Sequence, residues 1–168
     1  MNKNLLILGA GQYGRVVKEI ATDMNCFEKI SFLDDNSSLA VGKLTDYKFF
    51  EDSYSYAFVA IGNPDIRIKW LDLLEETNYT IPVLIHPKAY VSPSAKIMDG
   101  SIVEPMVVVH TECTIEKGCF ISAGAVINHA AKCLECCHID CNATVSGYAV
   151  VPAGTKVNIG AVFDSKSI

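Results

Sequence analysis

The chain has 168 residues, half of them hydrophobic, and a formal net charge of −5. This length suits one domain or two small ones. The acidic balance and the lack of a basic stripe argue against nucleic acid as a partner. No apolar run reaches the ~18 residues of a membrane span, and we expect no signal peptide before Leu5. Seven cysteines are an odd number for a disulfide framework, so we expect reduced thiols and a cytoplasmic protein.

Residues 1–86 follow the pattern of a small parallel α/β sheet. Apolar residues recur at helical spacing over 16–24 and over 66–74, where Ile66, Trp70, Leu73 and Leu74 form the predicted buried face. Strands alternating with helices predict a parallel sheet. The segment is too short for a complete dinucleotide-binding domain of two halves. The predicted strands are 4–8, 30–33, 57–61 and 81–85.

A glycine motif joins the first predicted strand to the first predicted helix. Gly9, Gly11 and Gly14 have the spacing Gly-x-Gly-x-x-Gly, and Asp34 follows Gly14 by 20 residues, at the end of the second strand. Glycine lets a diphosphate approach the backbone at a helix N-terminus, and a carboxylate at the strand end can accept ribose hydroxyls. The alternative is a tight strand-to-helix turn, with Asp34 and Asp35 capping a loop. The half-sized domain favours a nucleotide other than a dinucleotide.

Residues from Val91 onward repeat with a period of six. Apolar residues occupy one position of the repeat and small residues another, four places later. Spacings that alternate between four and two fit neither a helix nor a hairpin strand. They are typical of a hexapeptide-repeat β-helix, in which the large residue points into a triangular core and the small one lies at the corner. The apolar series is Val91, Ile97, Val103, Val109, Ile115, Ile121, Ile127, Cys133, Ile139, Val145, Val151, Val157 and Phe163, and the small series begins Ala95, Ser101, Val107, Cys113 and Cys119.

A group of cysteines within this repeat raises the question of a metal site. The segment reads Cys133-x-x-Cys136-Cys137-His138-x-x-Cys141, with ligand types that zinc prefers. The six-residue register, however, places Cys133 in the core and Cys137 at a small inward position. A second Cys-x-x-Cys at a suitable distance is absent. We therefore predict no metal site.

Several motifs in fixed order resemble those of a known family. The chain is similar to the sugar acetyltransferases of the NeuD/PglD type over nearly its whole length. The combination is specific, although each motif alone is not. The motifs are Ile7-Leu8-Gly9-Ala10-Gly11, Phe32-Leu33-Asp34-Asp35, Phe58-Val59-Ala60-Ile61-Gly62-Asn63-Pro64-x-Ile66-Arg67, Leu84-Ile85-His86-Pro87 and Val91-Ser92-Pro93-Ser94-Ala95.

The resemblance implies a fold and a set of ligands. Residues 1–86 would form a half-Rossmann α/β domain that binds a UDP-sugar, UDP-amino-sugars above all. Residues 87–168 would form a left-handed parallel β-helix that assembles into a homotrimer and binds acetyl-CoA between subunits. Besides the glycine motif and the two aspartates, the implied substrate contacts are Gly62, Asn63 and Arg67.

The resemblance also assigns roles in acetyl transfer. His129 matches the base that takes a proton from the attacking amine or hydroxyl, a role suited to a side chain with an ordinary pKa of ~6.5. His138 matches a histidine beside the thioester, and Gly147 a backbone N–H that stabilises the oxyanion. Ile159 completes the implied acetyl-CoA contacts. The alternative for His129 is a solvated wall residue; His110 is predicted to be on the surface and His86 to shape the linker.

Three departures from the family pattern affect these expectations. Gln12-Tyr13 stands where the family has Gly-His, which bears on substrate contacts. Ala130 replaces the acid that follows the catalytic histidine. Unless another acid, for example from a neighbouring subunit, takes its place, we expect the ring of His129 to lack a partner and to sample both tautomers. The chain stops soon after Gly160-Ala161, so some acetyl-CoA contacts are expected to be missing or supplied otherwise.

The predicted function is transfer of an acetyl group from acetyl-CoA to an amino or hydroxyl group of a nucleotide-activated sugar, in surface-glycan synthesis. The alternative is a nucleotide-sugar-binding trimer that has lost catalysis together with the acid at position 130 and the last coil.

Overall fold

A computed structural model describes residues 2–165 of the chain. The chain forms two compact units, Met1–Pro82 and Val83–Ile168. The boundary between them along the chain lies four residues before the division expected after His86. The outermost residues of the two predicted domains, Met1 and 166–168, lie outside the described residues.

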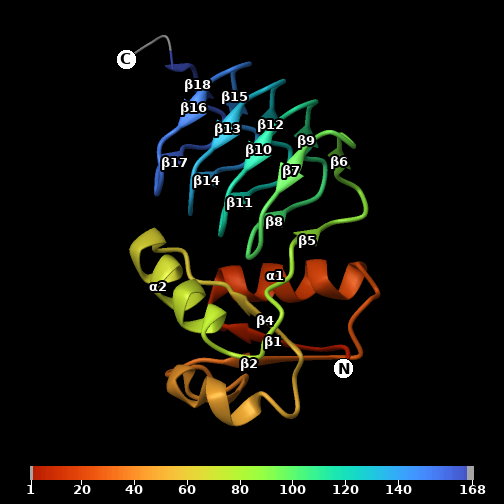
Figure 1. Ribbon diagram of the computed structural model, residues 1–168, viewed down its shortest axis with the longest axis vertical. Coiled ribbons are helices and arrows are strands. Elements are labelled where there is room, and N and C mark those ends of the chain that lie inside the picture. Colours follow the sequence, from red (N-terminus) through yellow and green to blue (C-terminus); the bar gives the residue numbers. More distant parts are fainter. Residues whose placement is uncertain (1, 166–168) are drawn as a thin grey trace. The chain divides into compact units, whose positions relative to one another are not determined.

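The first unit is a four-stranded parallel sheet with two α-helices, shown in Figure 1. The strand order is β3-β2-β1-β4. Helix α1 packs on β1 and β2, and α2 packs on β4. The expected half-Rossmann α/β domain is confirmed. The elements are β1 (Asn4–Leu8), α1 (Gln12–Asp23), β2 (Lys29–Leu33), β3 (Ala40–Gly42), the 3₁₀-helix η1 (Leu44–Phe50), β4 (Tyr56–Val59) and α2 (Pro64–Glu75).

The buried face of helix α2 agrees with the predicted one only at Leu74. Its buried residues are Arg67, Leu71 and Leu74, whereas Ile66 and Leu73 are exposed. The apolar pattern was misleading because the interior position one turn before Leu71 holds an arginine.

Within the described residues, no helix is both long enough and apolar enough to cross a membrane.

The predicted strand 81–85 does not belong to the α/β sheet. Leu84 and Ile85 form β5 (Leu84–Ile85), which pairs with β8 of the second unit through Leu84–Ile102 and Ile85–Val103. Only Thr80 forms an isolated bridge with Tyr56. A short apolar run suits a strand of the α/β sheet as well as a strand of the β-helix. Only the strand with which it pairs shows to which of the two it belongs.

The second unit is a left-handed parallel β-helix with three sheets (Figure 1). Strands 18 residues apart pair in parallel, as Thr114 does with Lys132, so three hexapeptides make one coil. The sheets have the orders β16-β13-β10-β7, β17-β14-β11-β8-β5 and β18-β15-β12-β9-β6. After β5, the strands are β6 (Tyr90–Val91), β7 (Lys96–Ile97), β8 (Ile102–Val103), β9 (Val108–Val109), β10 (Thr114–Ile115), β11 (Phe120–Ile121), β12 (Val126–Ile127), β13 (Lys132–Cys133), β14 (His138–Ile139), β15 (Thr144–Val145), β16 (Val150–Val151), β17 (Lys156–Val157) and β18 (Val162–Phe163).

The predicted register of the repeat is confirmed. The second residue of each strand points into one continuous core, fully enclosed from Val103 to Val151 and partly exposed at the two ends of the prism. The small series lies at the corners, and from Ser101 onward the residue before each small one adopts a left-handed backbone, as Gly124 (φ 72°) and Ala130 (φ 55°) do. This conformation, which costs little for glycine, lets the chain turn from one sheet to the next.

Three cysteines of the repeat, Cys113, Cys119 and Cys137, stand at inward corner positions where other repeats have serine or alanine. The Sγ atoms of Cys119 and Cys137 lie 3.1 Å from the carbonyl oxygens of Leu134 and Pro152. Ser101 makes the equivalent bond to Glu116 at 2.8 Å. Within the described residues, no group of three or more His, Cys, Asp or Glu side chains is arranged to hold a metal ion.

Burial predicts which thiols react. Cys26 is exposed and Cys141 partly exposed, while the remaining cysteines are buried. Burial also raises the pKa of Cys113 and of Cys133, which keeps both as unreactive thiols. With a water-soluble disulfide reagent such as Ellman's, we expect one fast thiol in the native protein and seven after unfolding. The Cys26→Ser variant should lose the fast phase; several fast thiols in the native state would contradict this packing.

Candidate functional site

The predicted nucleotide contacts lie on three loops at one edge of the α/β sheet. The loops follow β1, β2 and β4, which are neighbours in the order β2-β1-β4. The chain proceeds outward from β1 to β2 and β3, then returns to place β4 on the other side. Ligands of open α/β sheets bind at the carboxyl ends of strands beside such a reversal. The fold thus brings the residues of the predicted substrate site to one place.

Each glycine of the motif has a different local task. Gly9 has a φ of 105°, and its N–H donates to the carbonyl of Leu33 at 2.8 Å. A Cβ atom on Gly14 would overlap the carbonyl oxygen of Gly9. A Cβ on Gly11 would meet open space, and Gly11 is the N-cap of α1 without a side-chain cap. Gly9 and Gly14 therefore build the turn, and Gly11 presents the helix N-terminus.

These environments predict opposite effects on stability. Gly14→Ala forces backbone atoms apart and should lower the free energy of unfolding by about 3 kcal/mol or more. Gly11→Ala should change it by well under 1 kcal/mol, because its φ of −68° and ψ of −168° suit any residue. Thermal or urea unfolding monitored by circular dichroism measures both variants. Equal stability of the two variants would show that the turn is not packed as described.

The two aspartates after β2 are held by backbone groups. Asp34 Oδ2 accepts from the N–H of Ala10 at 2.8 Å, and its Oδ1 accepts from Asn36 and Ser37. These bonds, that from Ala10 first, lower the pKa of the Asp34 carboxyl. Asp34 thus ties the loop after β2 to the glycine motif. Asp35 Oδ1 accepts from the N–H of Leu44 at 3.1 Å.

The loop after β4 is held by its own helix. Asn63 Oδ1 accepts from the N–H of Ile66 at 3.1 Å and caps α2. The guanidinium of Arg67 is fully buried, and Nη1 donates to the carbonyls of Ile61 (2.8 Å) and Gly62 (3.0 Å). Sequence reasoning placed both side chains against the ligand; these contacts show them shaping the loop. A Cβ on Gly62 would meet open space.

In the β-helix, His129 lies in the turn between β12 and β13, one coil below Gly147. A Cβ on Gly147 would lie 2.8 Å from both Cε1 and Nε2 of the ring, so only glycine leaves room for the imidazole. The ring of Tyr148 meets the imidazole edge-on, with centroids 5.1 Å apart. The predicted pair of His129 and Gly147 is thus brought together.

The ring of His129 does have a partner, and it is an amide rather than the acid considered from the sequence. Its Nδ1 lies 2.9 Å from Oδ1 of Asn128, which also accepts the backbone N–H of His129 at 2.8 Å. An amide oxygen only accepts, so Nδ1 carries a hydrogen and Nε2 of the neutral ring has the lone pair. Asn128 can therefore fix the tautomer of the ring, which is one of the roles expected of an acid at position 130. In the sequence, the only indication of this contact was that Asn128 directly precedes His129.

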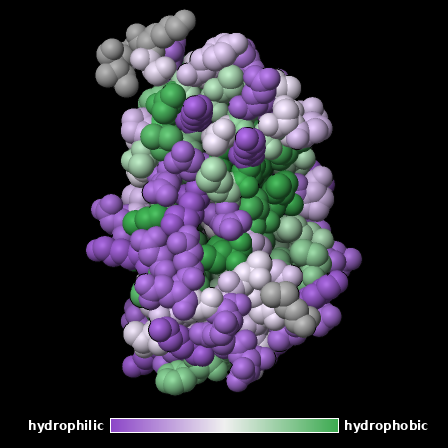
Figure 2. All heavy atoms as spheres, viewed as in Figure 1, coloured by the Kyte–Doolittle hydropathy of each residue, from purple (hydrophilic) through white to green (hydrophobic). Residues whose placement is uncertain are grey.

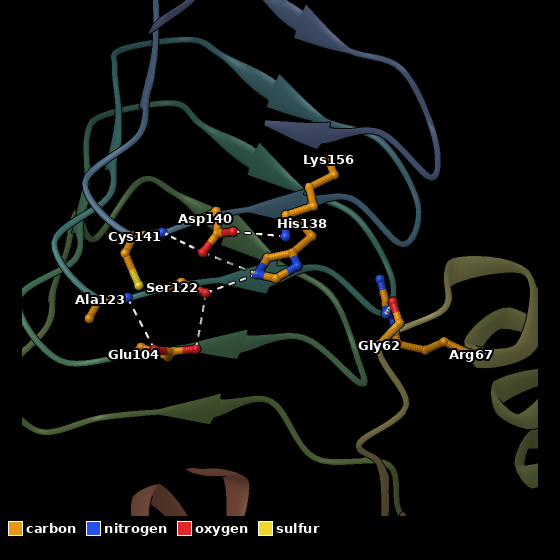
Figure 3. A network of polar contacts seen from close by, with 9 residues as sticks. All are labelled: Gly62, Arg67, Glu104, Ser122, Ala123, His138, Asp140, Cys141 and Lys156. Carbon is orange, nitrogen blue, oxygen red and sulfur yellow. Dashed lines mark hydrogen bonds and ion pairs between the residues drawn. The ribbon is translucent and has the colours of Figure 1, made fainter. Parts of the chain in front are cut away.

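His138 belongs to a second polar group, at a different side of the prism. Nine residues, half a coil, separate it from His129, and its strand β14 belongs to a different sheet from β12. Figure 3 shows Glu104, Ser122, Asp140 and Lys156 gathered around it. His138 Nε2 lies 3.0 Å from Ser122 Oγ and 3.9 Å from Asp140 Oδ1.

In this group, the carboxylate of Asp140 lies between the imidazole of His138 and the ammonium of Lys156. Lys156 Nζ pairs with Asp140 Oδ2 at 2.9 Å. Partial burial opposes ionisation of Asp140, but Lys156, the N–H of Cys141 and His138 lower the pKa of its carboxyl. Ile159, in the turn after β17, is exposed. Within one chain, His129 and Gly147 therefore form one group, and the residues around His138 form a separate one.

Two family models match the chain in these same segments. Residues 4–74 match the PglD N-terminal domain, and residues 94–129 match the bacterial transferase hexapeptide of six repeats. The matches cover both the glycine motif and the segment that ends at His129.

Solved structures resemble both units together. The acetyltransferase domain of PglB from Neisseria gonorrhoeae FA1090 is 31% identical, with a TM-score of 0.89 over 96% of this chain and 82% of that one. The same domain in complex with acetyl coenzyme A is 31% identical, with a TM-score of 0.87 over 96% of this chain and 82% of that one. A mutant of perosamine N-acetyltransferase from Caulobacter crescentus, in complex with CoA and GDP-perosamine, is 20% identical, with a TM-score of 0.72 over 95% of this chain and 90% of that one.

The fold and these matches place the chain among the hexapeptide-repeat acyltransferases. More narrowly, it belongs to the PglD/NeuD-type sugar acetyltransferases.

Proposed function

We propose that this acetyltransferase moves the acetyl group of acetyl-CoA to an amino or hydroxyl group of a nucleotide-activated sugar in glycan synthesis. The observation that carries the proposal is the ring of His129, held at Nδ1 by Asn128 and packed against Gly147. The PglB domain in complex with acetyl coenzyme A and the enzyme in complex with GDP-perosamine support the choice of the two substrates. Free thiols at all seven cysteines fit a cytoplasmic enzyme.

The proposed reaction follows from the tautomer of His129. Nε2 takes the proton of the acceptor as its nitrogen or oxygen attacks the thioester carbonyl, and a tetrahedral oxyanion forms. The backbone N–H of Gly147 stabilises that oxyanion. The C–S bond then breaks, and the imidazolium returns the proton to the departing CoA thiolate. The products are the acetylated sugar and CoA.

The nucleotide is proposed to lie at the loops after β1, β2 and β4. Its diphosphate would contact the N-terminus of α1 at Gly11, where the backbone is open. Because Asp34 is held by backbone N–H groups, we propose that Asp35 is the nearer of the two to the ribose or base. We propose a UDP-sugar as the substrate.

A second copy of the chain is proposed to complete the acetyl-CoA site. His129 and His138 lie on different sides of the prism, which suits a site that takes one histidine from each of two neighbours. The outer face of the sheet β18-β15-β12-β9-β6 carries almost only apolar side chains, whereas that of β16-β13-β10-β7 carries two lysines. Figure 2 shows an apolar patch over the β-helix. The apolar outer face consists of Tyr90, Val108, Val126, Thr144 and Val162.

From the sequence, the apolar run of Val107, Val108 and Val109 was expected to lie exposed on the wall of the prism and to drive assembly, which is correct only for one of the three residues. Of Val107, Val108 and Val109, only Val108 points outward, because the other two are fully buried in the core. For a homotrimer, light scattering should give three times the chain mass. Val126→Lys should shift the protein toward the monomer, and Lys132→Val, on the lysine-bearing face, should not. A monomeric wild type at micromolar concentration would contradict the trimer.

The activity is tested by release of CoA thiol from acetyl-CoA. We expect release only when a nucleotide sugar with an acceptor group is present, so the assay is run with UDP- and GDP-amino-sugars, their hydroxyl counterparts and free UDP. The strongest substrate names the nucleotide and the acceptor atom. Binding of nucleotide sugar without release from any member of the panel would favour the binding-only alternative.

A further inference from the structure

A buried carboxylate lies behind the group around His138. Glu104 is 7% exposed, although it lies at a corner of the β-helix after β8, one coil below Ser122. Its Oε1 is 3.1 Å from Ser122 Oγ, and its Oε2 accepts from the N–H of Ala123 at 3.1 Å (Figure 3). The catalytic chemistry proposed above does not use this side chain. A carboxylate is seldom buried without a specific partner or task.

The contacts determine where the hydrogens lie. Both oxygens of Glu104 accept, Oε2 from the N–H of Ala123 and Oε1 from the hydroxyl of Ser122, so the hydroxyl hydrogen lies between Oγ and Oε1. A hydroxyl has only one hydrogen, so Ser122 Oγ can only accept from His138, whose Nε2 is 3.0 Å away. The hydrogen in that contact therefore belongs to His138. The chain of hydrogen bonds runs from His138 to Ser122 to Glu104.

We propose that Glu104 is a positioning residue that acts through Ser122 to keep a hydrogen on Nε2 of His138. The neutral ring then presents Nδ1 as an acceptor, and it can donate from Nδ1 only as an imidazolium. The charged groups that face the ring are Glu104 and Asp140, which favour the cation, and Lys156, which opposes it while paired with Asp140. The arrangement is thus the reverse of that at His129, where the hydrogen lies on Nδ1.

The consequence for catalysis rests on the proposed function. If His138 lies beside the thioester, its orientation and charge determine how it meets the carbonyl oxygen. Two histidines held in opposite tautomers by an amide and by a serine–carboxylate pair can then serve as base and as donor in one reaction. Glu104 would affect acetyl transfer without contacting either substrate.

The tautomer is measured by long-range ¹H–¹⁵N correlation NMR of the imidazole nitrogens in the full-length protein above pH 8. The His138→Gln variant assigns the signals. We expect the Nε2–H form for His138 in the wild type. In Glu104→Gln, the new amide can donate to Ser122 Oγ, which releases the serine hydrogen toward Nε2, so the Nδ1–H form should gain population. Ser122→Ala should also mix the two forms, and Ser122→Thr, which keeps the hydroxyl, should restore the Nε2–H form.

The matched control is Glu112→Gln, an exposed glutamate at another corner, which should leave the spectrum of His138 unchanged. An Nδ1–H form in the wild type, or one tautomer throughout wild type, Glu104→Gln and Ser122→Ala, would overturn the proposal. For activity, we expect Glu104→Gln to lower kcat/KM for acetyl-CoA about tenfold while the affinity for nucleotide sugar is kept. Tautomer changes without acetyl transfer in any protein, wild type included, would refute the proposed function and leave the positioning role standing.

Discussion

The His129→Ala variant should turn over at least about 10²-fold more slowly than the wild type while binding nucleotide sugar with unchanged affinity. The reason is the loss of the base: without Nε2, the attacking group must give its proton to water. The remaining rate would come from binding and from the oxyanion contact at Gly147. Steady-state kinetics with the best substrate of the panel, with calorimetry for affinity, measure both quantities.

Two variants separate the base from its support. Asn128→Ala leaves the imidazole but removes the acceptor at Nδ1, so we expect turnover about tenfold below the wild type. His110→Ala, at an exposed histidine one coil below Asn128, is the matched control and should keep full activity. A His129→Ala variant within tenfold of the wild type would show that another group takes the proton.

The same geometry changes the expectation for Ala130. An acid at this position should raise activity only if the ring of His129 has no other partner. Since Asn128 already holds Nδ1, Ala130→Asp should leave turnover within about twofold of the wild type. Aspartate tolerates the left-handed backbone at this position, so the variant is a fair test.

The Gly11→Val variant should bind nucleotide sugar at least about tenfold more weakly. The side chain would stand at the N-terminus of α1, where the diphosphate is proposed to meet backbone N–H groups, and a lost charge-assisted hydrogen bond costs about 1.5–3 kcal/mol. A side chain here meets open space in the protein, so the unfolding temperature should hardly change. Gly11→Ala, with a smaller side chain, should have an intermediate effect. Equal affinity of Gly11→Val and wild type by calorimetry would show that the loop is only a turn.

The β-helix could be read from the sequence because its register is rigid. Every coil repeats the same inward positions, so the series through Ile115, Ile121 and Ile127 predicts the core directly. Helix α2 shows the limit of such patterns, because the buried position at Arg67 is polar and its guanidinium finds partners among the carbonyls of Ile61 and Gly62. Strand β5 could not be assigned for a different reason: its apolar residues suit either sheet, and the strand that it pairs with, β8, belongs to the β-helix.

The loops of the site could be predicted, but the hydrogen bonds within them could not. Asp34 and Asn63 were expected to contact the ligand; in the structure Asp34 also accepts from the N–H of Ala10 in the loop after β1, and Asn63 also caps its own helix. Residue spacing shows which loops meet, but not which oxygen a neighbouring N–H already occupies. Likewise, the amide of Asn128 and the carboxylate of Glu104 influence histidines through contacts that only the folded backbone creates.

The most direct test of the proposed chemistry is to follow the acetyl group itself. Acetyl-CoA labelled with ¹³C in the acetyl group is incubated with the enzyme and the nucleotide-sugar panel, and the products are analysed by mass spectrometry. We predict that a nucleotide sugar gains one labelled acetyl group for each CoA released, and that His129→Ala suppresses both together. Release of CoA with the label in acetate alone, or no label in any nucleotide sugar, would contradict the assignment of this chain as a nucleotide-sugar acetyltransferase.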